Sequence, residues 1–138
     1  MNAAKLLLPL LIAVLPLPSY GESVEQLVEN MVYLDNEGAS KSLSDMSKKR
    51  ALRAINQAAD KCAQSKDEVA NRAWIFTKKV RELGNIAYTV DFLEMVSLIK
   101  PRNDKSCAEL MADYSVLIST TATNHVDAII SMYIGSKH

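Results

Sequence analysis

Apolar side chains recur at intervals of three and four residues along most of this sequence, rather than at every second residue. Val24, Leu27, Val28, Met31 and Val32 form the first such set. This spacing places apolar groups on one face of an α-helix, and that face must be buried against other helices. We therefore predict an all-α fold, a compact antiparallel bundle of four to five helices.

Serines followed three residues later by Gln or Glu indicate where two of these helices begin. Ser23 with Gln26, and Ser65 with Glu68, have the spacing of a capping box, in which each residue bonds to the backbone N–H of the other. Glycine and proline indicate where helices end. The expected helices cover residues 23–36, a segment from Ser42 or Ser44 to Cys62, residues 65–83, residues 86–99, and a segment from Asp104 or Ser106 to Gly135.

Residues 86–99 are compatible with either a helix or a strand. Tyr88–Val90 has the composition of a strand, but the chain offers no second strand for pairing. Ile86, Val90 and Leu93 also have helical spacing, and Pro101 would end a helix there. We expect a helix.

The last expected helix is the longest, with apolar side chains at helical spacing from Cys107 to Tyr133. Ser119–Asn124 contains few strong helix formers, so we expect a local bend in this segment.

The first residues have the features of a secretory signal peptide. Lys5 provides a positive charge, an apolar run follows, and Ser19 and Gly21 are the small residues of a cleavage site. The apolar run is shorter than the roughly 20 residues that span a bilayer, although a retained anchor is the alternative. We predict that Met1–Gly21 is removed and that residues 22–138 form a single helical domain, periplasmic or secreted, without a membrane span.

Cys62 and Cys107 are the two cysteines of the chain. An isolated pair in an oxidising compartment usually forms a disulfide, and only one intramolecular pairing exists. The spacing Cys-x-x-Cys, typical of redox-active pairs, is absent. We predict a structural disulfide.

The charge balance argues against nucleic acid or an anionic membrane surface as the main partner. The chain has 16 basic and 16 acidic residues, whereas both of those partners require a basic surface. Lys48, Lys49, Arg50 and Arg53 form a local basic cluster. We interpret this cluster as a solvated helix face.

Residue patterns that would indicate catalysis or metal binding are not found. The sequence has no Gly-x-Ser-x-Gly motif and no phosphate-binding loop. On a helix, His125 and Asp127 diverge and could not share a metal ion. Asp91 and Glu94 share one helix side, but nothing in the sequence distinguishes them from surface acids. We therefore predict no catalytic residues, no metal and no cofactor.

His125 lies on the apolar line of the last helix, either buried and hydrogen-bonded or at a partner interface. Trp74, off the apolar line of its own helix, packs in the core or contacts a partner. Aromatic residues contribute disproportionately to interfaces. The candidate partner contacts are Trp74, Tyr88, Phe92, Arg102, Asp104 and His125.

The interpretation that fits these observations best is an exported, non-enzymatic binding protein, such as an inhibitor or immunity protein that occludes an enzyme. One alternative is a carrier or chaperone for an apolar ligand or client, in which methionines line an adaptable pocket. Another is a small hydrolase with acid–base carboxylates. A homodimer is also compatible, because amphipathic helices can leave one apolar stripe uncovered.

Overall fold

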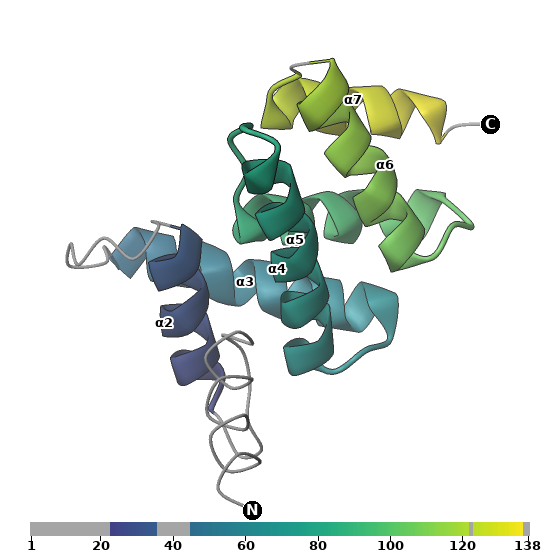
Figure 1. The fold of residues 1–138 in the computed structure, drawn as a ribbon. Coiled ribbons are helices and arrows are strands. Elements are labelled where there is room, and N and C mark those ends of the chain that lie inside the picture. Colours follow the sequence, from purple (N-terminus) through teal and green to yellow (C-terminus); the bar gives the residue numbers. More distant parts are fainter. Residues whose placement is uncertain (1–22, 36–44, 122, 137–138) are drawn as a thin grey trace, which may run out of the picture.

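The computed structural model describes residues 23–35, 45–121 and 123–136, and all regular structure in these residues is helical. The prediction of an all-α fold is confirmed. The helices are α2 (Val24–Asp35), α3 (Asp45–Cys62), α4 (Lys66–Glu82), α5 (Thr89–Ile99), the short 3₁₀ turn η1 (Lys100–Arg102), α6 (Cys107–Thr120) and α7 (His125–Gly135) (Figure 1). The count exceeds the expected four to five because the last expected helix is two helices, α6 and α7.

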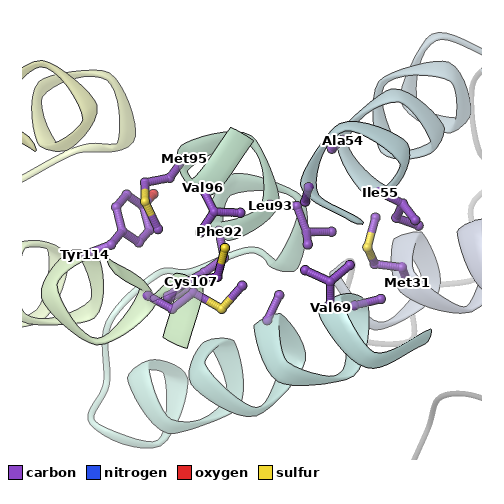
Figure 2. Close-up of a cluster of buried hydrophobic side chains, with 14 of the residues drawn as sticks. Met31, Ala54, Ile55, Val69, Phe92, Leu93, Met95, Val96, Cys107 and Tyr114 are labelled. Carbon is purple, nitrogen blue, oxygen red and sulfur yellow. The ribbon is translucent and has the colours of Figure 1, made fainter. Parts of the chain in front are cut away.

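Helix α5 lies at the centre of the molecule and contacts every other described α-helix. Phe92, Leu93, Met95 and Val96 are completely buried, and Figure 2 shows these side chains pointing into the core. A helix surrounded by other helices is apolar on most sides, so its sequence lacks a clear polar face. This burial explains why residues 86–99 resembled a strand in composition. The expected helix is confirmed for Thr89–Ile99, with Tyr88 in an extended conformation before it.

The two predicted capping serines are confirmed, although they differ in detail. Ser65 and Glu68 form the complete box, with each side chain accepting from the other's backbone N–H. At the first helix, Gln26 N donates to Ser23 Oγ at 3.1 Å, but the Gln26 side chain donates to Asn30 instead.

At the start of α6, Ser106 rather than Asp104 is the capping residue, and Glu109 completes a capping box with it. Ser42 and Ser44 lie outside the described residues.

The expected bend in the last helix is a break. Ser119, Thr120 and Thr121 each donate a side-chain hydrogen bond to the carbonyl four residues earlier, a pattern that competes with the helical backbone and often bends it. The chain then starts a new helix, because Asn124 accepts a hydrogen bond from Asp127 N at 2.9 Å. His125 is consequently the first residue of α7 rather than the middle of a long helix.

The predicted disulfide is confirmed: Cys62 and Cys107 are bonded, with their Cα atoms 5.9 Å apart. It links the C-terminal end of α3 to the first residue of α6. These two helices carry Arg50 and Tyr114, two members of the site described below.

No helix in the described part of the chain is both long and apolar enough to cross a membrane. The predicted signal peptide, Met1–Gly21, lies outside the described residues.

Candidate polar site

Four helices contribute to one polar cluster, which we call the His125 cluster: Arg50 from α3, Asp91 and Glu94 from α5, Tyr114 from α6 and His125 from α7. Asp91 and Glu94 are three residues apart and therefore lie on the same side of α5. The break before α7 places His125 at the start of a helix that packs against α5.

Arg50 holds both carboxylates of the cluster. Its Nε donates to Glu94 Oε2 at 2.7 Å, and its Nη2 donates to Glu94 Oε1 at 2.6 Å and to Asp91 Oδ1 at 2.9 Å. This two-point contact uses the planar fork of the guanidinium. Arg50 is 45 % exposed, in agreement with the predicted solvated face, and in addition it pairs with the two carboxylates of α5.

The imidazole of His125 has a partner at each ring nitrogen. Nε2 lies 3.2 Å from Glu94 Oε1 and 3.6 Å from Asp91 Oδ1, and Nδ1 lies 2.6 Å from Tyr114 Oη. A neutral ring can donate from Nε2 to Glu94 while Tyr114 donates to Nδ1. His125 is partly buried and hydrogen-bonded, so it combines a core position with access to the surface.

The two carboxyl groups have pKa values shifted in opposite directions. Burial raises the pKa of Asp91, although His125 and Arg50 act against this shift. Burial also acts to raise the pKa of Glu94, but hydrogen bonds from His125 and Arg50 outweigh it and lower the pKa to about 2. Burial, together with the two nearby carboxylates, raises the pKa of Tyr114, which therefore remains a donor.

Asp91, Tyr114 and His125 line a surface groove of about 490 Å³. The segment 84–88, which connects α4 to α5, and residues around the α6–α7 break complete the lining. The groove is large enough to admit a small molecule. Chemically, the cluster presents a carboxyl group of raised pKa and an imidazole to this space, and the carboxylate of Glu94 is hydrogen-bonded to that imidazole.

The same cluster contains the one group of three metal-ligating side chains found among the described residues. One ligand atom from each of Asp91, Glu94 and His125 lies within 4.8 Å of the other two. This group was not predicted from the sequence, because Asp91 and Glu94 lie more than 30 residues from His125 and only its neighbour Asp127 was considered as a second ligand. The signal in the sequence was the pair Asp91 and Glu94, which occurs on an otherwise apolar helix.

A second polar cluster, which we call the Arg81 clasp, consists of Arg81 and Asp35 with their backbone partners. Arg81 donates to the carbonyl oxygens of Leu34, Asp35 and Ala87, each at 2.8 Å. Asp35 accepts from the backbone N–H groups of Thr89 at 2.7 Å and Val90 at 3.1 Å. The clasp thus satisfies the end of α2 and the start of α5. Burial raises the pKa of Asp35, against the effect of these bonds.

The predicted partner contacts do not form one surface. Phe92 is completely buried between Phe76 and Tyr114, so its prediction as a surface contact is corrected. The exposed Tyr88 and the partly buried Trp74 lie on the Arg81 guanidinium, 5.6 and 5.8 Å from their ring centroids.

Arg102 and Asp104 are exposed in the connection between α5 and α6. Arg102 lies over the ring of Tyr133 on α7, at 4.1 Å from its centroid. Of the six predicted residues, only His125 belongs to the His125 cluster.

No family model matches this chain, and neither the curated proteins nor the solved structures compared with it contain a match.

Proposed function

We propose that this chain is an exported, non-enzymatic binding protein that acts on another exported protein, as an inhibitor or immunity protein does. The supporting observation is an apolar stripe on α7, formed by Val126, Ile130 and Ile134. These residues are four apart and therefore align along one helix face. They are 63, 50 and 58 % exposed, whereas a solvated helix face normally carries polar side chains.

The opposite side of α7 is used for packing within the molecule. Ala128 is buried, and Ile129 and Met132 pack against the core. Helix α7 lies at one end of the molecule and contacts α5 and α6 (Figure 1). The α7 stripe is therefore an outward apolar face, suited to a protein partner that offers an apolar groove to a helix.

The disulfide supports the location of this activity. Disulfides persist in oxidising compartments and are rare in the cytosol. The Cys62–Cys107 bond therefore agrees with export by the predicted signal peptide. A partner would then be periplasmic or secreted.

Affinity capture from periplasmic and secreted fractions tests the proposal. Ile130→Asp places a charge in the middle of the α7 stripe, and Leu98→Asp places one at a residue of α5 with a similar exposure of 54 %. We expect a specific protein to be captured by the wild type and by Leu98→Asp but lost with Ile130→Asp. Equal capture by all three proteins would contradict a role for this face.

The same variants test self-association. If sedimentation shows a wild-type dimer that Ile130→Asp alone dissociates, the α7 stripe is a homodimer interface. That result would replace the proposed heterologous partner with a second copy of this chain.

A hydrolase with acid–base carboxylates remains a second candidate, because one observation favours it. Asp91 and Glu94 have opposite pKa shifts, and Asp91 lies with His125 on the groove. Such a separation of pKa values is typical of paired acid–base groups. Turnover of chromogenic ester or glycoside substrates that is abolished by Asp91→Asn would support it. The carrier alternative gains no comparable support, since this groove is open to solvent rather than enclosed.

A further inference from the structure

We propose that Asp91, Glu94 and His125 form a binding site for a divalent transition-metal ion of the Zn²⁺ type, and that Arg50 competes with the ion for the same carboxylate oxygens. The site is independent of the α7 stripe, because it uses side chains on the inner side of the α5–α7 contact. Failure of either proposal therefore leaves the other standing.

The spacing of the ligand atoms agrees with a common metal ion. Nε2 of His125 lies 3.2 Å from Glu94 Oε1 and 3.6 Å from Asp91 Oδ1. Ligand atoms held at about 2.1 Å from a zinc ion are separated by roughly 3.0 to 3.5 Å. The two separations from His125 therefore match those around a bound ion, and all three ligand atoms lie within 4.8 Å of one another.

Tyr114 provides the support that a metal-binding histidine needs on its other nitrogen. Its Oη lies 2.6 Å from Nδ1 of His125. In the tautomer that carries its hydrogen on Nδ1, the imidazole donates a hydrogen bond to Tyr114 Oη, and the lone pair of Nε2 is free to bind an ion beside the carboxylates. The Tyr114 ring is buried and packs edge-on against Phe92 at 4.7 Å between centroids. The imidazole is thereby oriented before any ion binds.

Arg50 supplies the positive charge to the same oxygens. Its Nη2 contacts Glu94 Oε1 and Asp91 Oδ1, the two atoms that face His125. The Arg50 side chain is 45 % exposed, and it borders a second hollow of about 260 Å³. The guanidinium can rotate into that hollow, so binding of an ion exchanges one cation for another.

The ligand set and the groove define the class of ion. An imidazole favours zinc and its neighbours in the transition series over magnesium or calcium, which prefer oxygen ligands alone. Three protein ligands leave at least one coordination position for water or a small ligand. The groove reaches Asp91 and His125, so that position is accessible from solvent.

Titration of the purified, untagged protein tests this site, after treatment with a chelator. Zn²⁺ binding is followed by calorimetry and Co²⁺ binding by visible absorption. Removing the Arg50 charge takes away the cation that competes for these oxygens and leaves two adjacent carboxylates without a positive partner. We expect Arg50→Gln to bind Zn²⁺ at least about tenfold more tightly than the wild type, with one ion per chain.

Two further variants and one control complete the experiment. Glu94→Gln and His125→Gln should each weaken binding by at least about tenfold, the least that ligand-shell changes usually cost. His138→Gln removes the only other histidine and should change nothing. Circular dichroism checks that each variant folds. If His125→Gln does not fold, Glu94→Gln alone tests the ligand set.

The proposal is overturned if Arg50→Gln binds Zn²⁺ no more tightly than the wild type. It is also overturned if binding survives Glu94→Gln or disappears with His138→Gln.

Discussion

The Arg81 clasp and the His125 cluster both pair an arginine with carboxylates, and both contact α5. They differ in what their charged groups bind. In the clasp, Arg81 and Asp35 bond mainly to backbone groups at helix ends. In the His125 cluster, every hydrogen bond of Arg50, Glu94 and His125 described above joins two side chains.

This difference decides what each group can do. Backbone partners at a helix end cannot move without partial unfolding, so the clasp serves stability. Side-chain partners can rotate, exchange protons or accept an ion while the helices stay in place. A polar cluster is therefore a better functional candidate when its bonds join side chains and it borders a groove.

The largest expected effect is the loss of the Arg81 side chain. Arg81→Ala should lower the free energy of unfolding by about 3–5 kcal/mol. The substitution leaves buried Asp35 without its cation and removes the hydrogen-bond donor of three backbone carbonyl groups. Arg50→Ala is the matched variant and should cost about 1 kcal/mol or less, since Arg50 is much more exposed. Urea denaturation measures both. Equal losses would remove the distinction between the two groups.

Removal of the disulfide should have the next largest effect on stability, and it should affect the His125 cluster more than the Arg81 clasp. The bond closes a loop with a sequence separation of 45, which corresponds to about 4 kcal/mol in the chain-entropy model. Because it joins α3 to α6, the double variant Cys62→Ala, Cys107→Ala should increase hydrogen exchange around the His125 cluster more than around the Arg81 clasp. Uniform protection losses would show that both groups depend on the bond equally.

A smaller effect with a defined pH dependence is expected at Glu94. Glu94→Gln should cost about 1–3 kcal/mol at neutral pH in the presence of a chelator, because it removes charge-assisted bonds to Arg50 and His125. The pKa of Glu94 is lowered from 4.5 to about 2 on folding. The stability it provides is therefore complete above pH 4.5 and is lost as the pH falls towards 2.

Thermal unfolding of the wild type and Glu94→Gln across this range checks the expectation, with exposed Glu29→Gln as control. The difference between wild type and Glu94→Gln should narrow below pH 4.5. A constant difference would mean that the bonds of Glu94 do not depend on its charge.

Features defined by neighbours in the sequence were the most predictable. Ser65 with Glu68 specified a helix start through four consecutive residues, and two cysteines left one possible disulfide. The break before α7 was partly predictable, since Ser119–Asn124 is poor in helix formers. Helix α5 was harder to assign because its central burial removes the polar face that reveals a helix.

Neither polar cluster was predicted from the sequence, for different physical reasons. Glu94 lies 44 residues from Arg50 and 31 from His125, so only the packing of separate helices brings them together. The partners of Arg81 are mostly backbone atoms, which carry no residue-specific signal. Phe92 was misassigned because an aromatic side chain suits both an interface and a core.

The position of Trp74 makes its fluorescence a local probe of the region around Arg81. It is the only tryptophan, and its indole lies beside the Arg81 guanidinium. Its emission should therefore follow the opening of the Arg81 clasp, whereas changes in the His125 cluster act on the phenol of Tyr114. Selective excitation of the indole would thus follow the Arg81 clasp in an unlabelled molecule, separately from the His125 cluster.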